Sequence, residues 1–399
     1  MKSFLKILLR GFLAPLLLLV LIVGSSWFYF EPRSQPKDEA KTIGDIAAVL
    51  TDIVEHQYEP LVFHRDTHAK SNACVKVNFT IDPAVAGDPR LNFGVFKGKA
   101  DGDRTYKAWM RFSNAANVVT DDRTNDFRGL AIKLFGVEGE KLSVPESAKE
   151  PQEKHTQDFL FIGHDAFFAG NAQHFLDFFT ACQAGGYSCE PKSLPVAWHA
   201  LTHPRSTYNA IVGRKTFRAI EEIRWFSATP YQLGGADSIV KYGAFPAEEE
   251  PSRYSGIGDT PHYLADRLKE TLDPASGKRI KLNFMVQFRE KPEKQPIDNA
   301  LTAWDATDSP WHKAATIDVY PQNFDSPAQW EFCQNITFNP WHSLVEYQPV
   351  GGINRARRDL MDALQNVRLA KNGQNRFEPT GEEIFYPGAT FPWRKPPPT

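Results

Sequence analysis

The sequence predicts an α+β protein in which helices pack against a β-barrel, and two observations support this class. The first is a series of short strand-like runs with turn residues between them, such as Asp-Pro-Arg at 88–90. These runs cover residues 76–81, 91–96, 108–113, 130–135, 159–162, 280–288 and 314–319. The second is a set of segments with apolar residues at helical spacing, which argues against an all-β protein. They cover residues 172–182, 263–272 and 354–370.

The composition is that of an ordinary globular protein. The chain has 399 residues, of which 42% are hydrophobic and 24% are charged, and this is enough for one large core or two domains. The formal net charge is −2, with no excess of basic residues. This balance gives no reason to expect binding to nucleic acid.

The first thirty residues have the pattern of a membrane anchor. Residues 11–30 contain no charge and follow Lys2, Lys6 and Arg10. A helix of about twenty residues at ~1.5 Å each crosses the ~30 Å apolar core of a bilayer. The basic residues in front of the run predict a cytoplasmic N-terminus. We therefore expect a single-pass protein of the inner (cytoplasmic) membrane, with its folded domain on the periplasmic or extracytoplasmic side.

A cleaved signal peptide, which would give a secreted protein, is the alternative interpretation of this segment. Gly24-Ser25-Ser26 is small enough to be a cleavage region, although it is not a clear Ala-x-Ala site. The apolar run also resumes as Trp27-Phe28-Tyr29-Phe30, an aromatic cluster that suits the membrane interface. These cues favour an uncleaved anchor.

The chain after the anchor divides into a linker, one folded domain and a tail. Residues 31–41 are polar and contain prolines, as linkers do. Ile43, Ile46, Leu50 and Ile53 then recur at helical spacing and predict a helix over residues 42–58. We assign residues 42–375 to the folded domain and residues 376–399 to a proline-rich tail.

Four cysteines are present: Cys74, Cys182, Cys189 and Cys333. Cys182 and Cys189 flank the glycine-rich stretch Gln-Ala-Gly-Gly-Tyr-Ser, which can bring them together. In an exported domain this pair predicts a disulfide, whereas two free thiols are expected if the domain stays in the cytoplasm. No cysteine spacing is typical of a zinc site.

Five segments carry a resemblance to a known family. A histidine-bearing turn, Arg65-x-x-His68-Ala69-Lys70, leads directly into a predicted strand, and the other four segments follow at a distance. They are Arg-Phe-Ser at 111–113, Asp-Phe-Arg-Gly-Leu-Ala at 126–131, the strand and loop at 157–168, and Phe-Asn-Pro-Trp-His at 338–342 with residues 349–358. In this order they resemble the catalase superfamily, in particular its small catalase-related members. The resemblance covers about residues 50–370 and implies a catalase-like antiparallel β-barrel.

The resemblance also implies a cofactor, haem b, and the residues around it. His68 would be the distal acid–base group, and Ser113 would orient its second ring nitrogen. Arginines on four family positions would face the haem carboxylates or polarise the site. These are Arg65, Arg111 and Arg128, with Arg357 on the proximal side.

Thr67 precedes the histidine and bears on the substrate. Ordinary catalases have valine at this position, whereas relatives that rearrange fatty-acid hydroperoxides, such as allene oxide synthases of this fold, have threonine. A hydroxyl here could hydrogen-bond the imidazole of His68 or a bound hydroperoxide. The alternative is that Thr67 is only a β-branched strand residue.

Two positions depart from the family pattern. The family binds iron through a tyrosinate four residues after an arginine, and four residues after Arg357 the chain has Met361. Met361 is thus either an altered, soft iron ligand or a core side chain of an amphipathic helix. Gly163 stands where the family has a distal asparagine, and the neighbouring His164 could substitute for it.

Two functions follow from these residues. The first is a membrane-anchored haem protein that acts on hydrogen peroxide or on organic, for example fatty-acid, hydroperoxides. The second is a degenerate catalase-like domain, a haem-binding or interaction module without catalase activity. His68 and the arginines favour the first function, and Met361 and Gly163 favour the second. The expected partners are the hydroperoxide and the membrane.

Overall fold

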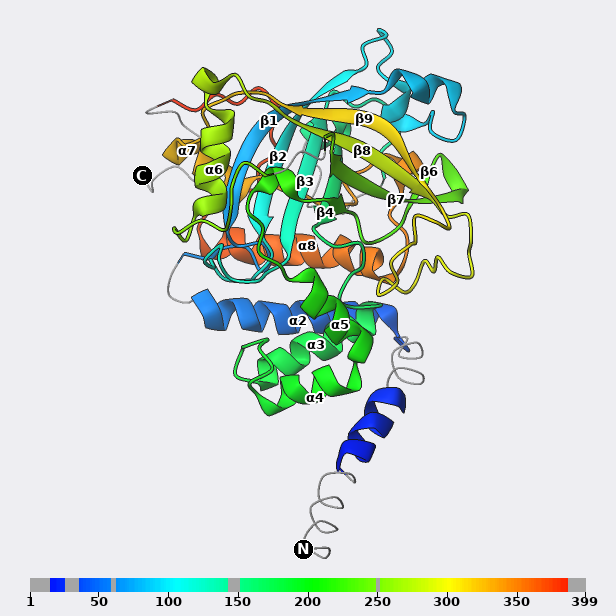
Figure 1. Cartoon of the computed structure of the whole chain (residues 1–399), viewed down its shortest axis with the longest axis vertical. Coiled ribbons are helices and arrows are strands. Elements are labelled where there is room, and N and C mark those ends of the chain that lie inside the picture. Colours follow the sequence, from blue (N-terminus) through cyan, green and yellow to red (C-terminus); the bar gives the residue numbers. More distant parts are fainter. Residues whose placement is uncertain (1–14, 26–35, 59–61, 143–150, 249–251, 387–399) are drawn as a thin grey trace, which may run out of the picture.

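A closed antiparallel barrel forms the centre of the protein in a computed structural model, which describes residues 15–25, 36–58, 62–142, 151–248 and 252–386 (Figure 1). Its described strands form one sheet in the order β5-β4-β3-β2-β1-β9-β8-β7-β6, and a second pairing of β5 with β7 closes eight of them into a barrel. The strands are β1 (Ser71–Ile81), β2 (Thr105–Asn114), β3 (Arg128–Phe135), β4 (Thr156–Ile162), β5 (Trp225–Phe226), β6 (Tyr231–Leu233), β7 (Gly235–Pro246), β8 (Ile280–Phe288) and β9 (Trp311–Val319). The predicted α+β barrel is confirmed.

Aromatic side chains fill the barrel interior. Phe79 of β1 and Phe159 of β4 both pack against Phe284 of β8, with ring centroids 5.1 and 4.8 Å apart. All three side chains are at most 2% exposed, because alternate residues of each strand point inward. This packed interior leaves the end of the barrel as the place for a ligand cavity.

One predicted strand is wrong, and three described strands were missed: the short β5 and β6, and the longer β7. Residues 91–96 do not form a strand: Gly94 adopts φ +46°, and a 3-10 turn covers Gly94–Lys97. A side chain at residue 94 would have no room, because a Cβ added there would lie 2.0 Å from Cε2 of Tyr347. Strand β7 was missed because its residues from Val240 to Phe245 are buried on both faces, which removes the alternation that identifies a strand.

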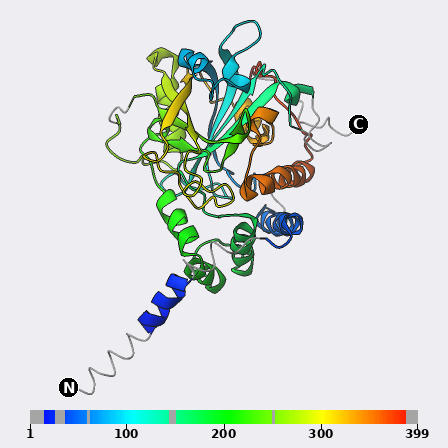
Figure 2. The same cartoon turned by 90° about the vertical axis from the view of Figure 1, so that its right-hand side faces the viewer.

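Helices form layers beneath one end of the barrel. They are α2 (Glu39–Tyr58), α3 (Ala172–Ala184), α4 (Leu194–Thr202), α5 (Pro204–Gly213) and α8 (Gly352–Lys371); α6 (Tyr263–Leu272) and α7 (Pro327–Asn335) lie against the barrel side. Figure 2 shows α8 next to the barrel and α2 and α3 beyond it. Leu50 of α2, Phe179 of α3 and Leu360 of α8 share one buried cluster, which joins the layers. The four predicted helices are present as α2, α3, α6 and α8.

The boundaries of the folded domain extend past the predicted ones. Helix α2 begins at Glu39, inside the predicted linker, because the Asp38 carboxylate accepts a hydrogen bond from the Lys41 backbone at 3.0 Å. At the other end Phe377 and Glu378 are buried, so the chain packs on the domain beyond residue 375. Residues 387–399 of the predicted tail lie outside the described residues.

The predicted anchor falls only partly within the described residues. Residues 15–25 are helical, and the side chains of residues 16–21 are exposed, whereas residues 1–14 and 26–35 are not described. Among the helices in the described ranges, none is both long enough and apolar enough to cross a membrane.

The predicted disulfide is confirmed. Cys182 near the end of α3 is bonded to Cys189, with their Cα atoms 4.5 Å apart, and the bond closes the glycine-rich loop after α3. Cys74 and Cys333 are free thiols and are buried.

Candidate functional site

A large cavity lies between the end of the barrel and the helices α2, α3 and α8. It contains about 1500 Å³ of empty space, counting the part that opens to solvent. Most of its wall is apolar, with phenylalanines from β4, from α3 and from the loop between them. The polar side chains on the wall are Arg65, Asp66, Thr67, His68, Arg111, Ser113, Thr337, Arg357, Gln365 and Arg368. A concave apolar wall with a few converging polar groups is typical of a small-molecule site.

His68 is held rigidly on this wall. Its backbone N–H donates to Ala115 O at 3.1 Å, and its carbonyl accepts from Nη2 of Arg111 at 2.8 Å. Its Nδ1 lies 3.0 Å from Oγ of Ser113. The residue adopts φ +58°, a left-handed conformation that is uncommon for a non-glycine residue and that Tyr187 and Ala228 also adopt.

Gly129 makes room for the imidazole. A Cβ added at this residue would lie 2.3 Å from Cε1 and 2.4 Å from Nδ1 of His68, and 2.8 Å from Oγ of Ser113. Ser113 and Gly129 are register partners on β2 and β3. The contact between His68 and Ser113 therefore depends on a glycine at residue 129.

The environment keeps His68 neutral. Burial, helped by the positive charges of Arg111, Arg357 and Arg65, lowers the pKa of His68 to about 3. The Ser113 hydroxyl lies 3.5 Å from Gly129 O, to which it can donate, so its oxygen can accept from Nδ1–H of His68. This arrangement leaves Nε2 unprotonated, which is the form that a general base needs at neutral pH.

Positive charge is in excess on the cavity wall. Among the described wall residues there are four arginines and one acid, Asp66. Arg65 and Arg111 both donate to Cys333 O, at 3.4 and 3.3 Å, which holds their guanidinium groups side by side. Burial and the charges of Arg111 and Arg368 lower the pKa of Arg65, and its Nε has no hydrogen-bond partner in the described chain. Such a cluster is stabilised by a bound anion.

One face of α8 contributes the opposite wall. Arg357, Met361, Leu364 and Arg368 line the cavity and recur at intervals of four, three and four residues. Nη1 of Arg357 lies 3.3 Å from Oγ1 of Thr229. Among the described wall residues Met361 is the one that carries sulfur, and no tyrosine is present.

Two solved structures are similar to this chain. A fungal catalase matches with a TM-score of 0.56 and 16% identity, over 80% of this chain and 62% of its own. Catalase A from Saccharomyces cerevisiae matches with a TM-score of 0.56 and 16% identity, over 80% and 64%. The chain has a catalase-like fold. It spans less than two thirds of the length of these catalases, and no protein-family model or curated protein matches it.

A catalase-like fold implies haem, and the wall residues can be tested against it. The excess of guanidinium groups suits the haem carboxylates, and the phenylalanines suit an apolar ring. His68 offers a neutral imidazole that could serve as a base beside the haem. Met361 of α8 offers a soft thioether on this wall, which could serve as a donor to a haem iron. The wall therefore fits haem.

Arg128 does not belong to this wall, contrary to its predicted cofactor-binding role. Its Nη2 donates to Asp122 O at 2.8 Å and to Thr124 O at 3.1 Å, so it supports the loop before β3. These two contacts hold its guanidinium group at the loop, and Arg128 is not among the residues that line the cavity.

The proposed substitute for the distal asparagine is also absent from the wall. Gly163 donates its backbone N–H to Arg128 O at 2.9 Å, and His164 lies beside Asp165, with 3.4 Å between Nδ1 and Oδ1. Neither residue lines the cavity. Of the residues expected on the distal side, His68, Ser113 and Thr67 line the cavity, and no asparagine is among the described lining residues.

Several residues of the site were missed in the sequence: Asp66, Gly129, Thr337, Gln365 and Arg368. Arg368 continues the spacing of Arg357, Met361 and Leu364, so the helical periodicity could have identified it. Gly129 was visible inside the 126–131 motif, but only the position of the His68 ring explains why it must be a glycine.

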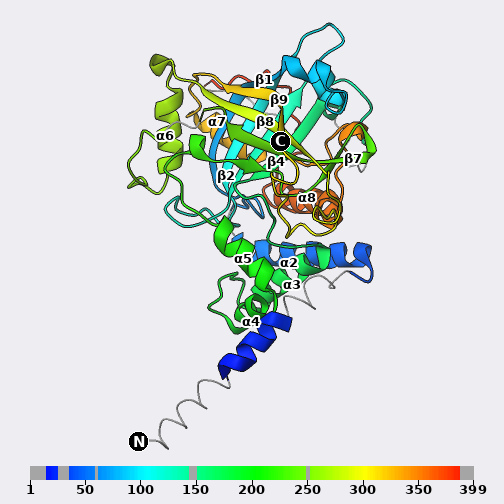
Figure 3. The same cartoon turned by 45° about the vertical axis from the view of Figure 1, so that its right-hand side comes forward.

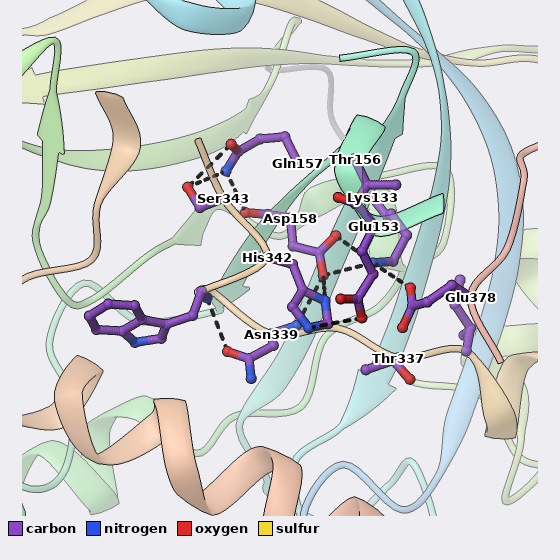
Figure 4. Close-up of polar contacts among 12 residues, drawn as sticks. Lys133, Glu153, Thr156, Gln157, Asp158, Thr337, Asn339, His342, Ser343 and Glu378 are labelled. Carbon is purple, nitrogen blue, oxygen red and sulfur yellow. Dashed lines mark hydrogen bonds and ion pairs between the residues drawn. The ribbon is translucent and has the colours of Figure 1, made fainter. Parts of the chain in front are cut away.

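A buried charged network lies behind the segment that carries the Phe-Asn-Pro-Trp-His motif (Figure 4). Nζ of Lys133 lies 2.9 Å from Asp158 and 3.3 Å from Glu378, and Nδ1 of His342 lies 3.3 Å from Oδ2 of Asp158. Asp158 also accepts from the backbone of Asn339 at 3.0 Å. These contacts fix the segment 337–344, whose first two residues line the cavity.

The same network contains a possible cation site that a side chain already fills. Ligand atoms of Glu153, His342 and Glu378 lie within 4.8 Å of one another. Nη2 of Arg376 lies 2.7 Å from Oε1 of Glu153, 3.5 Å from Nε2 of His342 and 3.8 Å from Oε1 of Glu378. The guanidinium group takes the position of a metal ion. Because Nη1 of Arg376 also pairs with Asp362 of α8 at 3.2 Å, the network supports α8.

Proposed function

We propose that this protein is a haem-dependent, hydroperoxide-metabolising enzyme of catalase-like fold. The observation that carries the proposal is His68: a neutral imidazole, held by Ser113 and exposed to a cavity with excess positive charge. The glycine opposite its ring, which makes room for the contact with Ser113, supports this role.

The residues that would hold haem b come from both walls. Arg65, Arg111 and Arg368 would bind its carboxylates, and Met361 would face the iron. When bound, the haem iron supplies the redox chemistry of O–O bond cleavage. A neutral thioether in place of tyrosinate raises the reduction potential, so dismutation of hydrogen peroxide is not the activity that this wall favours.

His68 would accept and then return the proton of the hydroperoxide. Nε2 is the free base of the neutral ring, so it takes the proton from the hydroperoxide O–H and returns it to the departing oxygen. The contact of Nδ1 with Ser113 fixes the ring and the tautomer during both transfers. The low pKa of His68 favours return of the proton.

The apolar wall supports an organic substrate. Phe127, Phe161, Phe167, Phe168 and Phe175 line the cavity, so an alkyl chain would be buried in favourable contact. Thr67 lies on the same wall next to His68 and offers a hydroxyl to the hydroperoxide group. We therefore favour organic, for example fatty-acid, hydroperoxides over hydrogen peroxide as substrates.

For localisation we propose a single-pass inner-membrane protein with its domain outside the cytoplasm. The disulfide between Cys182 and Cys189 supports an oxidising compartment. A reporter fused after Thr399 should be active outside the cytoplasm, and the protein should resist extraction with salt. A soluble mature form that begins near Ser26 would instead show a cleaved signal peptide.

The experiment compares rates with a fatty-acid hydroperoxide and with hydrogen peroxide for haem-loaded protein. His68→Ala should lower the rate by about 10²–10⁴-fold and leave the haem absorption in place. The matched control is His262→Ala, at an exposed histidine before α6.

The second candidate function, a haem-binding module without activity, is favoured by Met361. Equal slow rates for the wild type and His68→Ala would establish it.

A further inference from the structure

Two neighbouring helices present large apolar side chains to solvent. On α4, Leu194 and Trp198 are 82% and 57% exposed; on α5, Tyr208 and Ile211 are 60% and 68% exposed. The pairs are four and three residues apart, so each lies on one side of its helix. We call these four side chains the α4–α5 face. A cluster of this kind on a soluble surface marks an interaction site.

The sequence segment that carries this face has basic residues and no acidic residue. Residues 191–218 contain no Asp or Glu, although the whole chain has a net charge of −2. The segment contains five basic residues: Lys192, Arg205, Arg214, Lys215 and Arg218. Lys192 and Arg218 pair with Glu190 and Glu222 beyond its two ends, at 2.6 and 3.4 Å. The face is therefore an apolar surface within a basic segment, and its partner should be apolar with a negatively charged border.

The face lies at the end of the molecule from which the N-terminal segment extends. In Figures 1, 2 and 3 the helix at residues 15–25, with exposed side chains at 16–21, lies on the side of the helical layers that is remote from the barrel. Thirteen residues separate Ser25 from the start of α2 at Glu39. Thirteen extended residues reach at most ~45 Å, so an apolar segment in a bilayer keeps this end of the domain near its surface.

We propose that the α4–α5 face docks on an anionic membrane surface. Leu194 and Ile211 would enter the boundary between headgroups and acyl chains, and the amphipathic rings of Trp198 and Tyr208 would lie at headgroup depth. Lys192, just before α4, and Arg205, in the first turn of α5, would contact the anionic headgroups. The docked domain would thus lie on the bilayer instead of swinging freely on its linker.

Docking would also place α5 between the lipid and the cavity wall. On the inner side of α5 the Ser206 hydroxyl donates to Phe168 O, and Nδ2 of Asn209 donates to Phe167 O at 2.9 Å. Phe167 and Phe168 line the cavity, so the α4–α5 face and the cavity wall lie on opposite sides of α5. If the proposed function holds, on which this last step rests, the organic hydroperoxide comes from the lipid phase.

Hydrogen–deuterium exchange of the full chain tests the docking without any activity. Exchange of amides in residues 194–213 is compared in detergent micelles, in neutral phosphatidylcholine vesicles and in vesicles with phosphatidylglycerol. Relative to micelles, anionic vesicles should slow exchange by about fivefold or more. This factor corresponds to the attraction of a single basic residue to an anionic lipid surface. High salt should reverse part of the effect. Trp198→Ser with Ile211→Ser should abolish the protection, whereas the control Ile257→Ser with Val345→Ser, at exposed apolar residues elsewhere, should retain it.

Three outcomes would overturn the proposal. Exchange that is the same in micelles and anionic vesicles would exclude docking. Equal protection in neutral and anionic vesicles would exclude the anionic surface. Protection that rises with protein concentration in micelles would identify a second copy of the chain as the partner. None of these outcomes depends on haem. A negative result would therefore not contradict the proposed enzymatic activity, which is tested separately.

Discussion

Nδ1 of His68 lies 3.0 Å from Oγ of Ser113, and this contact is possible because residue 129 has no side chain. The three residues come from the turn before β1, the end of β2 and the start of β3. Adjacent strands thus place a base, its orienting hydroxyl and the space for both at one end of the barrel. This relationship links the fold to the chemistry proposed for it.

Gly129→Ala should remove the base from its position without unfolding the barrel. The added Cβ would lie 2.3 Å from Cε1 of His68, so the ring must move away from Ser113. We expect a loss of hydroperoxide turnover about as large as that of His68→Ala, about 10²-fold or more. Gly87→Ala is the control, because nothing lies within 4 Å of a Cβ there. Full activity of Gly129→Ala would show that the contact is not needed.

Thr67→Val tests the choice of substrate. The substitution removes a hydroxyl from the cavity wall and conserves the shape of the side chain. We expect hydrogen peroxide breakdown to rise relative to turnover of a fatty-acid hydroperoxide, as measured by the ratio of the two kcat/KM values. Ser71→Ala is a control at a hydroxyl that does not line the cavity. An unchanged ratio would mean that Thr67 is only a structural residue.

The disulfide should stabilise the layer that contains α3. It joins residues separated by 7 positions, and closure of so short a loop is worth ~2 kcal/mol in the chain-entropy model. Cys182→Ser should lower the free energy of unfolding by about that amount, as measured with urea. Thiol labelling of the unreduced, unfolded wild type should modify Cys74 and Cys333, and modification of all four cysteines would contradict the bond.

Glu153 should make stability depend on pH. Burial raises the pKa of Glu153 to about 7, although His342 and Arg376 oppose the shift. The folded state therefore retains a proton between pH 4.5 and 7 that the unfolded state has lost. This contribution to stability is complete below pH 4.5 and is lost as pH rises through 7.

Glu153→Gln should remove that pH dependence. The free energy of unfolding of the wild type should fall relative to that of the variant as pH rises from 5 to 8. The expected change in this difference is on the order of 2–3 kcal/mol. Denaturant unfolding at both pH values measures the gain, with Glu140→Gln at an exposed glutamate as the control. The same difference at pH 5 and pH 8 would mean that Glu153 is ionised throughout.

Much of the fold could be predicted because its elements have one buried face. The amphipathic spacing of α2 and α8 and the alternation of β8 are direct consequences of such burial. Strand β7 is buried on both faces and gave no alternation. The 3-10 turn at Gly94–Lys97 buries Val95 and Phe96, so its apolar residues resemble those of a short strand in the sequence.

The site was predicted only where short motifs carry it. The 65–70 and 111–113 motifs identified His68 and Ser113. The 126–131 motif did not reveal that Arg128 donates to the loop carbonyls of Asp122 and Thr124 and does not line the cavity. Arg368 is more than 250 positions from both Arg65 and Arg111. The grouping of these three residues on one cavity wall therefore becomes visible only in the folded chain.

The absorption spectrum of ferric, haem-loaded wild type and of Met361→Tyr tests the central claim, that the cavity binds haem with residue 361 facing the iron. We predict a Soret band in both proteins, with a tyrosinate charge-transfer signature in Met361→Tyr alone. Arg357, on the same face of α8, would stabilise the phenolate by its charge, and hydrogen peroxide breakdown should rise. Absence of a Soret band in the wild type, or identical spectra for the two proteins, would contradict the claim.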